Sequence, residues 1–362
     1  MSARTWELPP SQDRIPGRLP AVPFLIALTV LLLILNISAM GIGAVPVGWE
    51  DIWHWLYPEA GRDVADSEQS LAVLGYIRLP RLVLANLAGA GLALSGAALQ
   101  ALFRNPLADP GLLGISSGAA LGAGLMIVTG SAWLTGITVW AGDLAVPLAA
   151  FGGALGATLL VQGLASGKAS WAPATTLLAG IAVNALAGAG IGLLSWLADD
   201  AALRNFTFWS LGSLASATWD LLIPVMLLVL PGLILLFRQA APLNMILMGE
   251  AEAGHAGVDV RQLRHRVIAL SALCIGALVA VSGIIGFIGL VAPHLVRLSI
   301  GPDHRWLLPG SALLGALLLG AADLGARTLA APAELPIGLL TSLIGGPFFI
   351  WLIRRETSGI GG

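Results

Sequence analysis

Two arginines at the start of an apolar segment are the first residues whose type and spacing can do chemistry. Arg78 and Arg81 lie three residues apart, at the outer end of a predicted membrane span over residues 79–103. Guanidinium groups bind carboxylates through paired hydrogen bonds, so these arginines can receive acidic groups of a partner protein. The alternative is that they reach the phosphates of the membrane lipid.

A second set of charges predicts a contact within the chain. Asp323 and Arg327 lie four residues apart near the outer end of another predicted span, which places them on one helix face. We therefore expect an ion pair there. Other ionisable groups are scarce in the apolar segments. This scarcity argues against one class of membrane protein, a proton- or sodium-coupled secondary transporter.

A proline-rich turn separates two of the apolar segments. The stretch Arg104–Gly111 contains Pro106 and Pro110, which break helical hydrogen bonding, and Asn105 and Asp109 before them favour a turn. We expect non-helical backbone at the inner mouth of a pathway, because a membrane protein tolerates such backbone where it lines a cavity. An ordinary turn between helices is the alternative.

A small, acidic segment lies in the one sizeable inner loop, over residues 239–263. This segment, Gly249–Val258, is predicted to form a short helix. Its small side chains would let it lie in a groove of a cytoplasmic partner. The alternative is a solvated loop.

Several kinds of site are excluded by the sequence. The nearest match to a phosphate-binding loop, Gly163–Lys168, has one residue too few between its glycines, and the hydroxyl that would hold magnesium is missing after it. The single cysteine, Cys274, excludes an internal disulfide and a cysteine metal cluster. The histidines are not at ligand spacing on one helix, so we predict neither a metal site nor a catalytic residue.

The composition indicates that a lipid bilayer is the solvent for most of the chain. Of the 362 residues, 57% are hydrophobic and only 10% are charged, whereas a soluble domain carries about 25% charged residues. The apolar blocks approach the length of roughly 20 residues that a membrane helix needs. The net charge of −2 gives no indication of a nucleic-acid partner.

These blocks predict an all-α integral membrane protein of about ten transmembrane helices. A further short helix is expected at Asn205–Leu214. The predicted spans are 22–43, 79–103, 110–130, 143–165, 173–197, 219–238, 264–286, 288–300, 305–329 and 336–353.

Arginine and lysine gather in alternate loops, which predicts a multi-pass protein with both termini in the cytoplasm. We expect an N-terminal tail over residues 1–21, one ten-helix domain over 22–355 and a C-terminal tail over 356–362. The N-terminal segment does not have the pattern of a cleaved signal peptide.

Internal symmetry and glycine spacing add two expectations. Residues 94–106 align without gaps on residues 281–293, and the two predicted spans run in opposite directions, as in the inverted repeats of transporters. Three Gly-x-x-x-Gly pairs predict close approach of helices, within the chain, at a dimer face or at a surface that slides during transport. These pairs are Gly118–Gly122, Gly152–Gly156 and Gly188–Gly192.

Taken together, these segments resemble the permease subunits of type II ABC importers, which carry ferric siderophores, haem or cobalamin. The resemblance covers the chain from about Val22 to Arg355. The most specific stretches are Ile77–Arg81, Gly96–Gly114, Gly286–Arg297 and Ala333–Gly338.

The resemblance implies the ten-helix fold of the vitamin B12 and haem importers and a homodimer around a central pathway in a bacterial inner membrane. It also implies two cytoplasmic subunits that bind ATP and magnesium, and a periplasmic binding protein that delivers the substrate. The chain itself would then bind no cofactor and have no enzymatic activity.

The resemblance further implies three roles for particular residues: docking of the binding protein, coupling to the ATPase and gating of the pathway. Docking of the binding protein falls on Arg78, Arg81 and Arg327. Coupling to the ATPase falls on Gly249, Glu250, Ala251, Glu252, Gly257 and Val258. The translocation gate falls on Asn105 and Leu107, with Pro173, Ala174, Thr175 and Thr176 beside it.

The substrate follows from similarity within the family. The stretches Pro173–Asn184 and Ala198–Ser213 are most similar to the haem branch, which implies that haem, an iron-porphyrin, is the transported substrate. A planar apolar ligand suits a weakly polar pathway. The siderophore and cobalamin branches share the same architecture, so ferric siderophore and cobalamin remain as alternatives.

Overall fold

The computed structural model describes residues 18–43, 47–57, 70–130, 134–165, 173–331 and 333–358, and these residues form helices and their connections. Most of the predicted tail 1–21 and the last residues of the tail 356–362 lie outside the described residues. The elements are α1 (Ala21–Gly41), α2 (Trp49–Leu56), η1 (Val73–Arg78), α4 (Leu79–Leu102), η2 (Pro110–Leu113), α5 (Ile115–Thr129), α6 (Thr135–Ala141), η3 (Gly142–Leu144), α7 (Ala145–Ala165), α8 (Pro173–Leu197), α9 (Asp200–Ser210), α10 (Trp219–Phe237), α11 (Ala240–Met248), α12 (Glu250–His255), α13 (Val260–Ser282), α14 (Ile288–Ile300), α15 (His304–Thr328) and α16 (Ile337–Ser358).

Each of the ten predicted spans corresponds to a helix among the described residues. Seven helices are long and apolar enough to cross a membrane, and α5, α14 and α16 add three shorter apolar ones. The predicted helix at Asn205–Leu214 begins earlier than expected, at Asp200, because the carboxylate of Asp199 caps it. Oδ1 of Asp199 accepts a hydrogen bond from the backbone N–H of Ala202, 2.7 Å away.

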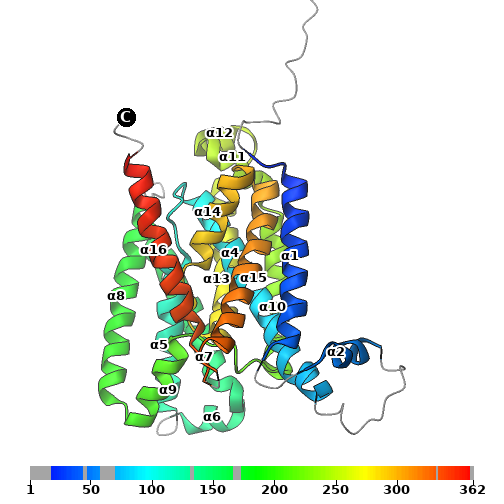
Figure 1. Cartoon of the computed structure of the whole chain (residues 1–362). Coiled ribbons are helices and arrows are strands. Elements are labelled where there is room, and N and C mark those ends of the chain that lie inside the picture. The colour runs from blue at the N-terminus through cyan, green and yellow to red at the C-terminus, as the bar shows by residue number, and fades with distance from the viewer. Residues whose placement is uncertain are drawn as a thin grey trace, which may run out of the picture.

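The helices form one bundle with two distinct ends (Figure 1). The first residues of α1 and the last residues of α16 lie at the end that carries α11 and α12. The helices α2, α6 and α9 lie at the opposite end. We call the end with α12 the inner end and the other the outer end, after the sides predicted from the arginines. That the start of α1 and the end of α16 lie at one end agrees with an even number of crossings.

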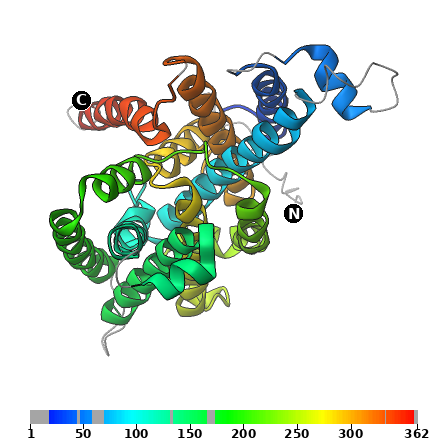
Figure 2. The ribbon, with the colours of Figure 1, turned by 90° about the horizontal axis from the view of Figure 1, so that it is seen from below.

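The helix α4 forms the centre of the bundle, where it contacts α15, α13, α14 and α10 (Figure 2). In the segment that contains α4, 83% of the apolar stretch is buried, against 6% in α1. The helix α1 is therefore a peripheral helix that contacts mainly α15. Its exposed leucines and isoleucines are what a helix surrounded by lipid requires.

Glycines allow the backbones of α4 and α15 to touch. A Cβ atom added to Gly89 would lie 2.3 Å from the carbonyl oxygen of Gly315, and a Cβ added to Gly315 would lie 2.3 Å from the carbonyl oxygen of Gly89. In a bilayer no hydrophobic force brings helices together, so such close contact between backbones is a main source of helix association.

The three predicted glycine pairs divide into two kinds. Gly118 and Gly122 of α5 approach the backbone of α7 closely, which confirms tight contact within the chain. An added Cβ would meet nothing within 4 Å at the other two pairs, so tight contact within the chain is wrong for them. These pairs are Gly152–Gly156 of α7 and Gly188–Gly192 of α8.

The two halves of the predicted repeat run in opposite directions along the bundle axis, since α4 runs from the outer to the inner end and α13 runs the other way (Figure 1). Both helices are followed by non-helical backbone, after Leu102 and after Ser282. The gapless alignment of residues 94–106 on residues 281–293 nevertheless pairs the interior of α4 with the end of α13. The ends of the two helices are therefore not at matching positions of the alignment.

Replacing Gly89 with alanine tests the contact between α4 and α15. The new methyl group would overlap a backbone carbonyl that cannot rotate away, so we expect a loss of stability of about 1–3 kcal/mol. The measurement is thermal unfolding of the purified protein in detergent. Gly163→Ala is the matched control because nothing lies within 4 Å of its added Cβ. Equal unfolding temperatures of the two variants would contradict the contact.

Candidate functional site

The predicted docking arginines come together at the outer end of the bundle. Arg81 of α4 lies between two carboxylates: its Nε is 2.9 Å from Oδ1 of Asp323, and its Nη1 is 2.8 Å from Oε1 of Glu334. Nη1 is also within 3.0 Å of Oε2 of Glu334. Asp323 comes from α15, and Glu334 from the connection between α15 and α16, so Arg81 joins three parts of the chain.

The other two arginines complete this outer arginine cluster, which consists of Arg78, Arg81, Arg327, Asp323 and Glu334. Nε of Arg327 lies 3.3 Å from Oδ2 of Asp323, which confirms the predicted ion pair. Arg327 also donates to backbone carbonyls at the end of α1, and Arg78 donates to the carbonyl of Met40 there.

The cluster is mostly buried within the subunit. Arg78 is 4% and Arg81 is 7% exposed, and the side chain of Asp323 is 1% exposed. The side chain of Glu334 is 41% exposed. A carboxylate, and not a guanidinium, is therefore the accessible part of the contact between Arg81 and Glu334. The docking role of the three arginines stays a prediction.

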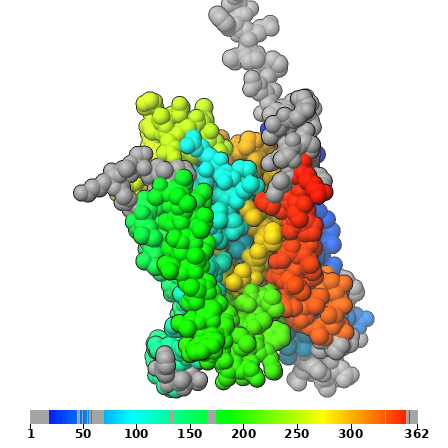
Figure 3. All heavy atoms as spheres, turned by 90° about the vertical axis from the view of Figure 1, so that its left-hand side faces the viewer, coloured from blue at the N-terminus to red at the C-terminus, as the bar shows by residue number. Residues whose placement is uncertain are grey.

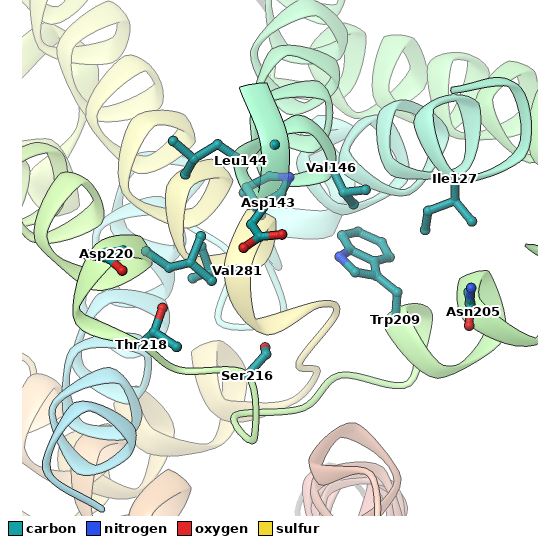
Figure 4. Close-up of a pocket in the computed structure, with 14 residues that line it drawn as sticks. Ile127, Asp143, Leu144, Val146, Asn205, Trp209, Ser216, Thr218, Asp220 and Val281 are labelled. Atoms are coloured by element: carbon teal, nitrogen blue, oxygen red, sulfur yellow. The ribbon is translucent and has the colours of Figure 1, made fainter. Parts of the chain in front are cut away.

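An open pocket of about 870 Å³ lies beside the bundle axis at the outer end. Figure 4 shows the indole of Trp209 and the carboxylate of Asp143 facing each other across it, with Ser216, Thr218 and Asp220 on the wall. Sequence reasoning missed this pocket because its residues come from distant segments. The described residues that line it include two carboxylates and no arginine or lysine, a poor match for a ligand that carries carboxylates.

The predicted proline-rich turn is present at the inner end. The helix α4 ends at Leu102, and Arg104 has a φ of 48°, which ends the helix. Oδ1 of Asn105 accepts from the backbone N–H of Leu107 at 2.9 Å, and Oδ1 of Asp109 accepts from that of Gly111 at 2.7 Å. Burial raises the pKa of the Asp109 carboxyl, and the hydrogen bond from Gly111 partly offsets this rise.

The turn is held against α8 by a polar contact that the sequence did not reveal. Nδ2 of Asn184 donates to the carbonyl of Gly111 at 3.0 Å, and Oδ1 of Asn184 accepts from the hydroxyl of Ser117. A Cβ added to Gly180 would lie 1.7 Å from the carbonyl oxygen of Leu112, so the backbones touch. The turn and the middle of α8 therefore form one unit.

The predicted gate residues do not all share this contact. Leu107 is 39% exposed and Asn105 is half-buried. Pro173 begins α8, Ala174 and Thr175 are exposed, and Thr176 is 1% exposed. The observed contacts of the turn are with Gly180 and Asn184, further along α8 than these four residues. Their role as a gate stays a prediction.

The predicted coupling segment is a helix on the surface of the inner end. It forms α12, which begins after Gly249, where φ is 134°, and ends before Gly257, where φ is 86°. Ala251 and Glu252 are exposed, and Val258 is half-buried. Glu250 pairs with Arg264 of α13 at 3.6 Å, which fixes one end of the segment to the bundle.

The helix α11, which leads into α12, is anchored to α15 by one side chain. Nδ2 of Asn244 donates to Oδ1 of Asp303 at 2.6 Å, while Oδ1 of Asn244 accepts from the backbone N–H of His304 at 2.9 Å. The amide thus holds the first turn of α15. Sequence reasoning missed this clamp because its partners lie about sixty positions apart.

A second polar contact joins α14 to the last turns of α4. Nη2 of Arg297 donates to Oε1 of Gln100 at 2.7 Å, and Nε2 of Gln100 lies 3.4 Å from the carbonyl oxygen of Gly289. Gln100 is 2% exposed, so this contact is internal.

Among the described residues, no cluster of histidine, cysteine and acidic side chains could hold a metal ion.

Replacing Asn184 with leucine tests the contact between the turn and α8. The change leaves the half-buried carbonyl of Gly111 without its donor, which costs about 1–3 kcal/mol of stability. Thermal unfolding in detergent measures the loss. Asn205→Leu is the control, since Asn205 is exposed on α9. A loss of the same size in the control would show that the contact does not hold the turn.

Comparison with known proteins places this geometry in a family. The model of the FecCD transport family matches residues 29–355. The hemin transport system permease protein HmuU of Yersinia pestis is 47% identical over 332 residues, which cover 91% of this chain and 94% of the relative. The vitamin B12 import system permease protein BtuC of Vibrio vulnificus is 41% identical over 280 residues, 77% of this chain and 82% of the relative.

A solved structure gives the same answer for the fold. It is described as an inward-facing conformation of an ABC transporter assigned to the metal-chelate type. The TM-score is 0.79 at 32% identity, and the match covers 92% of this chain and 99% of the other. With the family model matching nearly the whole bundle, this chain belongs to the FecCD transport family and is a multi-pass membrane permease.

Proposed function

We propose that this chain is the membrane-spanning subunit of an ATP-driven importer that moves haem into the cytoplasm. The observation that carries the proposal is the 47% identity, over 91% of the chain, with the hemin transport permease of Yersinia pestis. The relatives named for vitamin B12 match a smaller share of the chain at lower identity. Cobalamin is therefore the second candidate, with ferric siderophore as a third.

The proposed assembly is a homodimer in the bacterial inner membrane, with both termini in the cytoplasm. Its support is a face bordered by α8 and α16, between which the cyan segment that follows α4 and yellow parts of the α13–α14 region are visible (Figure 3). The helix α8 exposes Leu186 and Trp196 as well as the small residues Gly188 and Gly192. Small residues on an uncovered face favour contact between helices in a membrane.

The proposed substrate site is the pathway between two such subunits. Haem is the transported substrate and not a resident cofactor, so shape and weak apolar contact suit it better than tight ligation, which would oppose release. The outer pocket at Trp209 is not assigned to haem, because Asp143 and Asp220 would repel its carboxylates.

The energy for transport comes from two ATP-binding subunits that hold ATP and magnesium on the inner face. The sequence of this chain contains no complete phosphate-binding loop. The exposed helix α12 is the proposed docking element, and the clamp between Asn244 and Asp303 passes its motion to α15. Alternating access then requires the turn Arg104–Gly111 and α8 to move together.

The substrate arrives on a periplasmic binding protein that docks at the outer end. Carboxylates of that protein bind the guanidinium groups of Arg78, Arg81 and Arg327 in both subunits. An ion-coupled secondary transporter is less well supported, because the buried carboxylate of Asp323 already pairs with Arg81 and Arg327. A carboxylate that is neutralised by two arginines is a poor proton carrier.

The first test is uptake by the reconstituted importer. We expect liposomes that contain the chain, its ATP-binding subunit and the binding protein to accumulate haem only when ATP is present. The ATP must be on the side of the membrane where the ATP-binding subunits lie. Haem, cobalamin and a ferric siderophore are compared at equal concentration. Uptake of cobalamin or siderophore alone would refute the substrate, and uptake that needs an ion gradient and no ATP would refute the importer.

Replacing Gly254 with tryptophan tests docking at α12. Gly254 lies on the surface of the helix with nothing within 4 Å of an added Cβ, so the subunit should fold normally. The indole should prevent a close fit and reduce co-purification of the ATP-binding subunit at least tenfold. Gly136→Trp makes the same change at the equally open Gly136 of α6, at the outer end. Equal co-purification by both variants would argue against docking at α12.

A further inference from the structure

We infer that Glu334 occupies, within the free permease, the place on Arg81 that a carboxylate of the binding protein takes on docking. Glu334 is then an affinity-setting residue of the outer docking surface, because the partner must displace it. The inference rests on the proposed function, in which a binding protein docks on the outer arginine cluster. To that function it adds a role for Glu334, which exchanges its place on Arg81 with a carboxylate of the partner.

The geometry separates the two carboxylates that bind Arg81. The Nε edge of the guanidinium faces Asp323 at 2.9 Å, and the Nη1 group faces both oxygens of Glu334 at 2.8 and 3.0 Å. A guanidinium presents its donors in a fixed plane, so two carboxylates can bind it at different edges without competing. One edge can therefore change partner while the other stays bound.

Burial decides which edge changes partner. The side chain of Asp323 is 1% exposed, whereas that of Glu334 is 41% exposed. Removing one member of a buried ion pair costs much free energy, because the other member is left charged and unsolvated. A pair with a solvated member contributes little to stability. Asp323 therefore holds Arg81 in position, and Glu334 is the carboxylate that can leave.

Charge balance makes the exchange specific for an acidic partner. The three arginines of the cluster carry three positive charges, and Asp323 and Glu334 carry two negative charges, so the cluster already has one positive charge in excess. When Glu334 turns away, the excess rises to two positive charges. A partner carboxylate lowers this excess again, and a neutral or basic side chain does not.

The exchange needs no movement of the backbone. The connection is fixed directly after Glu334 by two hydrogen bonds, from the N–H of Leu335 to the carbonyl of Ala326 at 3.1 Å and from the N–H of Ile337 to the carbonyl of Gly212 at 3.0 Å. The glutamate side chain can rotate into solvent about its own bonds. A docked partner then lies directly over α15 and the start of α16.

The test compares Glu334→Gln with the wild type in nanodiscs that hold the permease with its ATP-binding subunits. Affinity for the haem-loaded binding protein is measured by surface plasmon resonance at two salt concentrations. Glutamine keeps the size of the side chain and removes its charge, so we expect binding to tighten about fivefold or more, through slower dissociation. Glu334→Ala, which removes the competing group entirely, should tighten binding as well.

Asp200→Asn is the matched control, because Asp200 is an exposed acidic residue of α9 at the same end of the molecule. We expect it to change the affinity less than twofold. Unchanged or weaker binding by both Glu334 variants, with thermal unfolding like that of the wild type, would overturn the exchange. Equal tightening in Asp200→Asn would overturn it too, as an effect of overall charge. If the wild type does not bind the protein at all, the proposed function fails, and this inference with it.

Discussion

The constraint on which this structure depends is that a bilayer offers no partner to a free backbone N–H or carbonyl group. Wherever a helix stops inside the bundle, the protein itself must supply the missing partners. At the inner end, in the turn after α4, the side chains of Asn105, Asp109 and Asn184 each bind a backbone group. The turn after α4 is therefore stabilised by its own set of hydrogen bonds, and one of them attaches α8 to it.

The same constraint explains why glycine matters more here than large apolar side chains. Helices in lipid gain little by burying leucine, so close contact of backbones has to hold them together. Gly89 and Gly315 bring α4 and α15 into direct contact, and Gly118 and Gly122 do the same for α5 and α7. This close contact places α4 at the centre and leaves α1 at the edge, with few buried residues.

The helices could be predicted from the sequence because hydropathy and span length are local properties. Even the short α14 and the ion pair between Asp323 and Arg327 follow from residues near each other in the chain. The short α2 and α6 were missed because neither is long enough to give the apolar signal of a span. The glycine pairs were ambiguous because identical spacing serves a contact inside the chain and an uncovered face.

The site could be predicted only in part. Arg78, Arg81 and α12 were recognised from local motifs, but the contacts that decide how they act join distant segments. Glu334 meets Arg81 from 253 positions away, and Asn244 meets Asp303 from 59 positions away. No spacing rule reaches that far, so only the folded chain shows that Arg81 is already bound to an acid.

The helix α15 connects the two ends of the molecule, so events at one end can affect events at the other. It is one helix of 25 residues, roughly 37 Å long at about 1.5 Å per residue. Its first turn is clamped by Asn244, beside α12, and its last turns carry Asp323 and Arg327 of the outer arginine cluster. A single helix of this length would let the proposed binding protein at the outer end and the proposed ATP-binding subunits at the inner end influence each other without any substrate in the pathway. An empty binding protein would then already alter the rate of ATP hydrolysis.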